Sequence, residues 1–207
     1  MGGFPLSHYL ELINTVIINK KNRLISYDDS LKLVGTGRSA FVFRMASSEK
    51  AIKVFFPDFT HIAQEEAEIY KSLVGITYFP TIHETGLNYI VMDYIEGYTF
   101  FECMTHGRII TSDHIKEVDR ALSLASAQGL NPSDIHLRNI IITSNNEIKL
   151  IDVARYRQVK VCNQWNNLKK AHQHFYCKPF FLKKVPTPFL NMVAYLYKKG
   201  FIPFFRS

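Results

Sequence analysis

The chain has 207 residues, of which 47% are hydrophobic and 21% are charged, and this composition excludes an intrinsically disordered protein. The length allows one large domain or two small lobes. The net charge of +7 is unevenly placed, because residues 1–152 hold 14 Lys and Arg against 18 Asp and Glu, whereas residues 153–207 hold 11 Lys and Arg and no acidic residue. The sequence therefore predicts a slightly acidic body followed by a basic tail rich in aromatic residues.

The cysteine content and the hydropathy indicate where the protein works. Cys103, Cys162 and Cys177 have no metal-type spacing, so we expect reduced thiols. The first residues lack the pattern of a signal peptide, and no apolar run reaches the length of a membrane span. We therefore expect a cytoplasmic protein, either free or peripheral at the inner membrane surface.

The first half of the chain predicts mainly strands. Residues 4–18 have apolar positions at helical spacing and predict an amphipathic helix within an N-terminal helical extension, 1–28. Residues 30–56 predict three strands, and residues 60–73 predict a helix. Residues 81–95 predict two further strands.

The second half predicts a helix and then a hairpin. Thr111 or Ser112 can cap a helix from residue 113 to about 127, and Gly129 follows as a stop signal. Residues 139–143 and 148–151 predict a short hairpin. Strands come first and helices later without βαβ alternation, and this order predicts an α+β protein with two lobes.

Two features of the predicted strands bear on phosphate chemistry. Gly35 and Gly37 lie in a turn between two strands, where glycines allow close backbone approach and exposed N–H groups can hold a phosphate. An ordinary Gly-rich hairpin turn is the alternative. Lys53 ends the apolar triplet Ala51-Ile52-Lys53, and a lysine buried there needs an anionic partner. An edge-strand lysine that reaches solvent is the alternative.

The helix at residues 60–73 offers a partner for this lysine. Glu66 lies four residues after Ile62 and three before Ile69, so it projects from the apolar face, where a carboxylate needs a cation. Lys53 is the candidate cation. Glu65 has nearly the same orientation, so the sequence leaves the choice between Glu65 and Glu66 open.

A third feature lies around the predicted hairpin. Asp134 and Asn139 are five residues apart, and Asp152 follows thirteen residues later at the end of a short strand. Carboxylate and amide oxygens are hard ligands that suit Mg²⁺, and these three residues can converge on one site. An Asx-rich turn followed by an unrelated hairpin is the alternative.

Taken in order, these segments resemble a protein-kinase-like fold, and most resemble small bacterial proteins labelled as serine/threonine protein kinases. The resemblance runs from Leu31 to Asp152 and includes Tyr89–Gly97, which looks like the hinge between two lobes. It implies an N-lobe at 29–95, with an antiparallel sheet, one helix and an ATP site. It also implies a truncated, mainly helical C-lobe at 96–207, with the catalytic loop and the basic tail.

The resemblance also implies roles for single residues, with ATP and Mg²⁺ as cofactors. Lys53 would contact the α- and β-phosphates, and Glu66 would hold it. Asp134 would take or orient the proton of the acceptor hydroxyl, while Asn139 and Asp152 would bind Mg²⁺. The remaining ATP contacts would come from the glycine turn, the adenine pocket and the hinge backbone: Gly35, Gly37, Val42, Ala51, Met92, Asp93, Ile95 and Ile141.

Several positions depart from the family pattern. Ala40 replaces the third glycine, Pro132-Ser133 replaces the usual His-Arg, and Asp152-Val153-Ala154 replaces Asp-Phe-Gly. Only 55 residues follow Asp152, too few for a full activation segment and the usual C-lobe helices. The platform that would bind a peptide substrate therefore stays undecided.

These departures leave the substrate and the tail open. The main expectation is transfer of the ATP γ-phosphate to serine or threonine of a protein. His136 stands where kinases of small molecules, such as aminoglycoside phosphotransferases, often have histidine, so a small-molecule or lipid-headgroup hydroxyl is an alternative. A non-catalytic nucleotide-binding scaffold is another. The tail can complete the C-lobe core, bind an anionic membrane surface, or, less favoured, bind nucleic acid.

Overall fold

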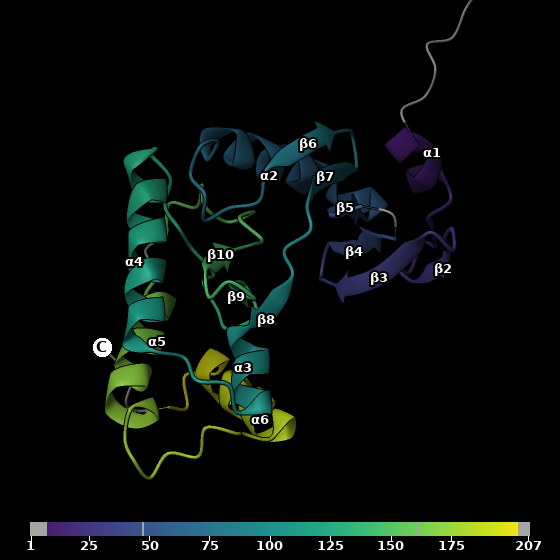
Figure 1. The fold of residues 1–207 in the computed structure, drawn as a ribbon. Helices are drawn as coiled ribbons and strands as arrows, with labels where there is room; N and C mark the ends of the chain where they lie inside the picture. The colour runs from purple at the N-terminus through teal and green to yellow at the C-terminus, as the bar shows by residue number, and fades with distance from the viewer. Residues whose placement is uncertain (1–7, 47, 161, 203–207) are drawn as a thin grey trace, which may run out of the picture. The chain divides into compact units, whose positions relative to one another are not determined.

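A computed structural model describes residues 8–46, 48–160 and 162–202 (Figure 1). The chain divides into two compact units. The N-terminal unit holds the described residues up to Ile95 together with Asp152–Ala154, and the C-terminal unit holds Glu96–Ile151 and the described residues from Arg155 onward. Helices and antiparallel sheets occur together, which confirms the α+β class.

The N-terminal unit is built on a five-stranded antiparallel sheet in the order β3-β4-β5-β7-β6. A 3₁₀ turn at Pro57–Phe59 and helix α2, Thr60–Ser72, connect β5 to β6. The predictions for residues 30–56, 60–73 and 81–95 are confirmed. The strands are β3, Leu31–Thr36; β4, Ala40–Met45; β5, Lys50–Phe55; β6, Ile82–Thr85; and β7, Tyr89–Asp93.

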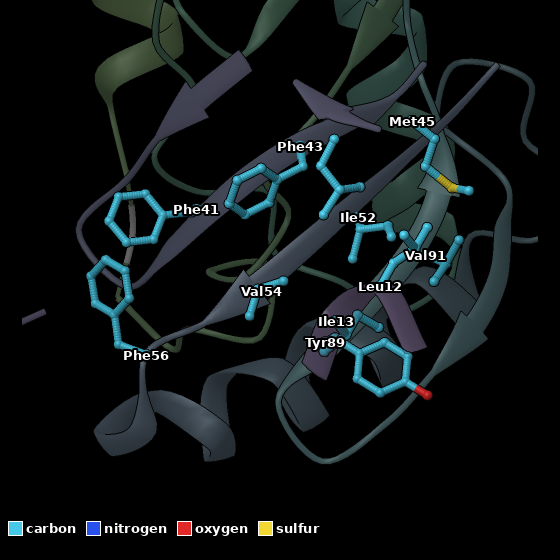
Figure 2. Close-up of a cluster of buried hydrophobic side chains, with 11 residues drawn as sticks. Leu12, Ile13, Phe41, Phe43, Met45, Ile52, Val54, Phe56, Tyr89 and Val91 are labelled. Atoms are coloured by element: carbon cyan, nitrogen blue, oxygen red, sulfur yellow. The ribbon is translucent and has the colours of Figure 1, made fainter. Parts of the chain in front are cut away.

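The two faces of this sheet have different environments. One face forms a hydrophobic core with Leu12 and Ile13 of helix α1, His8–Asn14 (Figure 2). The sheet contributes to this core Phe41, Phe43, Met45, Ile52, Val54, Tyr89 and Val91. Side chains alternate along a strand and paired residues share a face, so the opposite face carries Val42, Ala51, Lys53 and Met92. The strand residues predicted to bind ATP through their side chains therefore share the face opposite α1.

The N-terminal extension is only partly helical. The helix predicted at 4–18 ends at Asn14, and residues 4–7 lie outside the described part of the chain. A small hairpin follows, with β1 at Ile17–Ile18 and β2 at Leu24–Ser26. The run Val16-Ile17-Ile18 is β-branched and favours extended backbone over helix. The helical spacing at 15–18 was therefore misleading.

The C-terminal unit contains a three-stranded antiparallel sheet, ordered β10-β9-β8. Strand β8 spans Gly97–Thr99 and leads into helix α3, Phe100–His106, while β9, Ile140–Thr143, and β10, Ile148–Leu150, form the predicted hairpin. Helix α4, Ser112–Ala127, confirms the predicted helix. Thr111 is its N-cap and accepts a hydrogen bond from the His114 N–H.

The basic tail folds into helices that the sequence did not predict in detail. Helix α5 spans Gln164–Ala171, a π-helical turn follows at His172–Tyr176, and α6 spans Thr187–Lys198. Tyr156, Trp165 and Tyr176 are buried, and the Trp165 indole N–H donates to Asp119 at 2.7 Å. Part of the tail therefore completes a core. Within the described ranges, no helix has the length and apolar character needed to cross a membrane.

Candidate functional site

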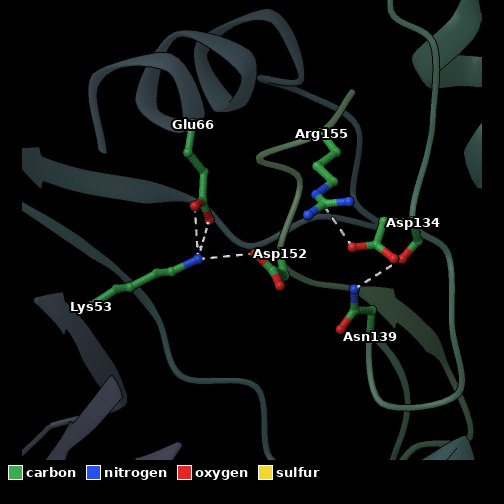
Figure 3. Close-up of polar contacts among 6 residues, drawn as sticks. All are labelled: Lys53, Glu66, Asp134, Asn139, Asp152 and Arg155. Carbon is green, nitrogen blue, oxygen red and sulfur yellow. Dashed lines mark hydrogen bonds and ion pairs between the residues drawn. The ribbon is translucent and has the colours of Figure 1, made fainter. Parts of the chain in front are cut away.

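Lys53 and Glu66 form a buried ion pair in the N-terminal unit. The Lys53 Nζ lies 2.8 and 2.7 Å from the two carboxylate oxygens of Glu66 (Figure 3). Glu66 is fully buried and Lys53 is 9% exposed. Glu65, the other carboxylate that the sequence left open, has an exposed side chain. Strand β5 and helix α2 thus place Glu66 against Lys53.

Asp152 adds a second carboxylate to this group. The Lys53 Nζ lies 3.1 Å from Asp152 Oδ1, and the Asp152 side chain is half exposed. One lysine thus meets two carboxylates, which gives the cluster a formal charge of −1. A cluster of this charge, open to solvent at Asp152, suits a cation better than an anion.

Burial and charge shift the pKa values of this cluster. Desolvation tends to lower the pKa of Lys53, but the carboxylates of Glu66 and Asp152 raise it above the ordinary value. Desolvation, with a smaller contribution from Asp152, raises the pKa of Glu66 more than Lys53 lowers it. Lys53 therefore stays protonated and cationic at neutral pH.

The glycine turn lies between β3 and β4 of the same unit. Gly37 N–H donates to the Ala40 carbonyl at 2.9 Å and closes the turn. A Cβ on Gly35 would lie 3.3 Å from the Cβ of Val42, its register partner across the strands. Neither Gly35 nor Gly37 has left-handed φ. At Gly35 the backbone thus uses the lack of a side chain for close packing against Val42.

The predicted hinge consists of β7 and the residues that follow it. Met92 is buried and pairs in register with Ala51. Asp93 N–H donates to the Thr81 carbonyl at 3.0 Å, so its carbonyl is the backbone group that could meet an adenine edge. Ile95, the last hinge residue predicted to bind ATP, also ends the continuous part of the N-terminal unit.

Asp134 and Asn139 lie together in the C-terminal unit. Asn139 is buried, and its Nδ2 donates to the Asp134 backbone carbonyl at 3.3 Å (Figure 3). Asn139 N–H also donates to the His136 carbonyl at 2.9 Å and tightens the segment. Ile141, the remaining residue predicted to contact ATP, is buried in β9 of this unit.

Both candidate aspartates have unusual backbone conformations. Asp134 has φ +60° and Asp152 has φ +62°, in the left-handed region that few non-glycine residues occupy. Aspartate and asparagine tolerate this region better than most side chains. Conformations of this kind concentrate at functional sites, where the surrounding structure holds them in place.

Sequence reasoning missed two residues of this segment, Arg155 and Asn131. Arg155 Nε lies 3.5 Å from Asp134 Oδ2. Asn131 N–H donates to the Tyr156 carbonyl at 2.6 Å, and its Nδ2 donates to the Gln158 carbonyl at 2.6 Å. These bonds hold the chain after Asp152 alongside Asp134. The one available signal for Arg155 was its position three residues after Asp152.

A pocket of about 280 Å³ opens beside Asp134 in the C-terminal unit. Its lining combines two cations, three amides, a phenol and a thiol with the single carboxylate of Asp134. The lining residues are Asp134, Arg155, Gln158, Lys160, Cys162, Asn163, Gln164 and Tyr197. A small polar group that reaches this pocket would meet the carboxylate predicted to accept its proton.

The two residues predicted to bind Mg²⁺, one in each unit, each offer a hard oxygen ligand. Asp152 offers a half-exposed carboxylate, and Asn139 offers Oδ1 because its Nδ2 donates to Asp134. Mg²⁺ usually takes one or two protein ligands of this kind and completes its shell with phosphate and water. Throughout the described ranges, no group of three or more His, Cys, Asp or Glu residues could hold a metal alone.

Comparison with known proteins places the chain in a family. No protein-family model matches it. The chain is 47% identical over 193 residues to a protein of Bacillus subtilis (strain 168) named "Putative serine/threonine-protein kinase YrzF", and the match covers 91% of this chain and 90% of that protein. The chain belongs to this kinase-like family. The match extends well past Asp152 into the basic tail, because it covers nearly the whole chain.

Proposed function

We propose that the protein is an ATP- and Mg²⁺-dependent kinase of a bilobal, protein-kinase-like fold with a reduced C-lobe, and that it phosphorylates serine or threonine of a protein. The observation that carries the proposal is the buried pair of Lys53 and Glu66, joined by Asp152. A buried ion pair seldom stabilises a fold more than apolar residues of similar volume. The presence of the Lys53–Glu66 ion pair on an apolar sheet face is better explained by a function that needs a cation in a fixed position.

Phosphoryl transfer needs such a cation because little covalent chemistry falls to the protein. Lys53 would bind the α- and β-phosphates of ATP, with Glu66 fixing the position of its ammonium group. Asp152 and Asn139 would hold Mg²⁺, which neutralises charge on the phosphates when bound. The turn at Gly35 and Gly37 would lie over the phosphates.

Asp134 would act on the acceptor. Its carboxylate would orient the hydroxyl and take its proton, while the hydroxyl oxygen bonds to the γ-phosphorus and the bond from that phosphorus to the β–γ bridging oxygen breaks. ADP leaves with the electron pair of that bond. Arg155, whose Nε lies 3.5 Å from Asp134 Oδ2, would hold this carboxylate in position.

A small hydroxyl compound is the second candidate acceptor. The pocket beside Asp134 has a volume of about 280 Å³, below the roughly 300–1,000 Å³ usual for small-ligand sites, so it would hold a small group. A serine side chain with its neighbours or a compact alcohol could supply that group. His136, two residues after Asp134, favours the small molecule, and the name of the related protein favours the protein acceptor.

The test is transfer of labelled γ-phosphate from ATP with Mg²⁺. Separate reactions contain generic protein acceptors, small alcohols and sugars, and no added acceptor. Label on the chain itself or on an added protein, and none on the small compounds, supports the protein kinase. Label on the small compounds alone would replace it with the second candidate.

A nucleotide-dependent thermal shift completes this test. A rise in melting temperature with ATP and Mg²⁺, but no transfer to any acceptor, would indicate a nucleotide-binding scaffold and contradict the proposed activity. If neither a thermal shift nor transfer is observed, both proposed kinase activities are contradicted. Asp113→Asn changes an exposed carboxylate on α4 that is paired with Lys116, and it should behave as the wild type in both measurements.

A further inference from the structure

The aromatic residues of the basic tail separate into two sets. Tyr156, Trp165 and Tyr176 are buried and belong to the core of the C-terminal unit. Among the described residues of the tail, five other aromatic side chains and three aliphatic ones are exposed. These exposed residues are Val159, Phe175, Phe180, Leu182, Phe189, Met192, Tyr195 and Phe201. Core completion therefore accounts for only part of the tail, and the remaining large apolar side chains form exposed surface.

Helix α6 shows how part of this surface is ordered. Leu190 lies on its buried side and packs with Phe101 and Val185. The opposite side carries Phe189, Met192 and Tyr195, which are spaced three residues apart and are each about half exposed. The helix is thus apolar on both sides, but the described residues of this chain pack against only the Leu190 side. We call the exposed set Phe189, Met192, Tyr195 and Phe201 the α6 surface.

The end of α6 fixes Phe201 to the same helix. Gly200 has φ +71°, its N–H donates to the Tyr197 carbonyl, and Phe201 N–H donates to the Leu196 carbonyl at 3.0 Å. These two bonds form a Schellman motif, which turns the chain back against the last helical turn. Phe201 stays 63% exposed although its backbone is held. The apolar group is therefore displayed in an ordered position.

The charge around the α6 surface is positive. Lys198 and Lys199 end the helix with exposed side chains, and Lys199 Nζ lies 5.8 Å from the centre of the Tyr195 ring. No Asp or Glu occurs anywhere in residues 153–207. Apolar side chains with lysines at their border match a partner that is apolar inside and anionic at its surface.

We propose that the α6 surface is a docking site for an anionic lipid bilayer. Aromatic rings and Met192 would enter the headgroup region, while Lys198 and Lys199 would contact acidic headgroups. A nucleic acid would match the lysines and stack on the rings, but Met192 offers it no stacking plane. The proposal is independent of the kinase activity, because α6 lies outside the residues assigned to ATP.

The test is co-sedimentation of the full chain with vesicles of phosphatidylcholine alone and of phosphatidylcholine mixed with phosphatidylglycerol. The wild type should bind the mixed vesicles, bind phosphatidylcholine at least tenfold more weakly, and lose binding as salt is raised. Phe189→Gln/Tyr195→Gln and Lys198→Glu/Lys199→Glu should each weaken binding about tenfold or more. All four side chains are exposed, so the melting temperature should stay near that of the wild type.

Matched controls come from the N-terminal unit. Val74→Gln/Leu87→Gln changes two exposed apolar residues, and Lys20→Glu/Lys21→Glu changes an exposed lysine pair. Both should bind vesicles as the wild type does. The proposal is overturned by equal binding to both vesicle types, by α6 variants that bind normally, or by binding to single-stranded oligonucleotides but not to vesicles. Self-association that the α6 variants abolish, without vesicle binding, would also overturn it.

Discussion

The ammonium group of Lys53 is held by two carboxylates at 2.7 and 3.1 Å on a sheet face that is otherwise largely apolar. Removing Glu66 leaves Lys53 with only the half-exposed Asp152 as a partner, whereas removing both Lys53 and Glu66 leaves no charge in the buried site. Stability and activity should therefore respond differently to single and double substitutions at this pair.

Glu66→Ala should lower the free energy of unfolding by about 3 kcal/mol, because Lys53 would lose its buried partner. Lys53→Met/Glu66→Leu should recover stability to within about 1 kcal/mol of the wild type. It should not recover ATP-dependent activity, because the cation is gone. Urea denaturation measures the first effect, and transfer of labelled γ-phosphate from ATP measures the second.

The exposed pair of Asp113 and Lys116 is the control for this prediction. Asp113→Asn should change stability by less than about 1 kcal/mol, as for most surface ion pairs. If the double variant at Lys53 and Glu66 were as unstable as Glu66→Ala alone, the pair would be needed for the fold itself, and the functional reading would lose its main support.

The residues of the site were predictable from sequence to different degrees. The pairing of Lys53 with a helix glutamate follows from two local patterns, an apolar strand and a helical period, and Glu66 matched both. Arg155 carried no such pattern, because its contact with Asp134 depends on how Asn131 holds the chain after Asp152. The spacing of residues along the sequence does not predict contacts of this kind, which form only when the fold brings separate segments together.

Strands β6 and β7 are joined by a side chain as well as by their backbone. The Asp93 carboxylate accepts a hydrogen bond from the Thr81 N–H at 2.9 Å and lies 2.7 Å from the His83 ring. Partial burial tends to raise the pKa of Asp93, but the bonds to Thr81 and His83 lower it below 3.8. A lowered folded-state pKa stabilises the protein above the unfolded value and loses this effect as pH falls through the folded value.

Asp93→Asn should therefore reduce stability at neutral pH by about 1 kcal/mol or less, since the side chain is partly exposed. The difference from the wild type should shrink as the pH falls through the lowered pKa of Asp93, where the wild-type carboxyl also becomes protonated. Urea denaturation across this range measures both values. A difference that stays constant with pH would show that the charge of Asp93 is not what joins these strands.

Helix α1 covers the sheet face opposite Lys53. Ile13 is 5% exposed within this core, so Ile13→Ala should cost about 2–5 kcal/mol. Ile17→Ala, at a half-exposed residue of β1, should cost less than about 0.5 kcal/mol. Because α1 contacts the other face, the nucleotide-dependent thermal shift of Ile13→Ala should persist. Loss of that shift in a folded Ile13→Ala protein would contradict the separation of the two faces.

Long elements with a clear period were predicted well. Helices α2 and α4 each extend over more than three turns, and α4 carries a cap at Thr111 and a stop at Gly129, so local signals were sufficient. Strands β1, β2 and β8 have two or three residues each, and whether they form depends on the strands with which they pair. Helices α5 and α6 were missed because their apolar residues do not all face a core.

The proposed activity needs groups from both units of the molecule. Lys53, Glu66 and Asp152 belong to the N-terminal unit, while Asp134 and Asn139 belong to the C-terminal unit. The excess positive charge lies in residues 153–207, which hold 11 basic residues and no acidic one. In the proposed function, phosphate binding thus depends on Lys53 and a metal, and surface binding depends on the tail.

The proposed kinase activity depends most closely on Asp134, and transfer of γ-phosphate by Asp134→Asn tests its role. Asparagine also tolerates the left-handed backbone at this position, so the variant should fold and bind ATP with Mg²⁺ as the wild type does. Loss of the proton acceptor should lower the transfer rate by about 10²–10⁴-fold. Transfer within a few-fold of the wild-type rate, with the same acceptor and the same ATP affinity, would contradict the assignment of Asp134 and the mechanism built on it.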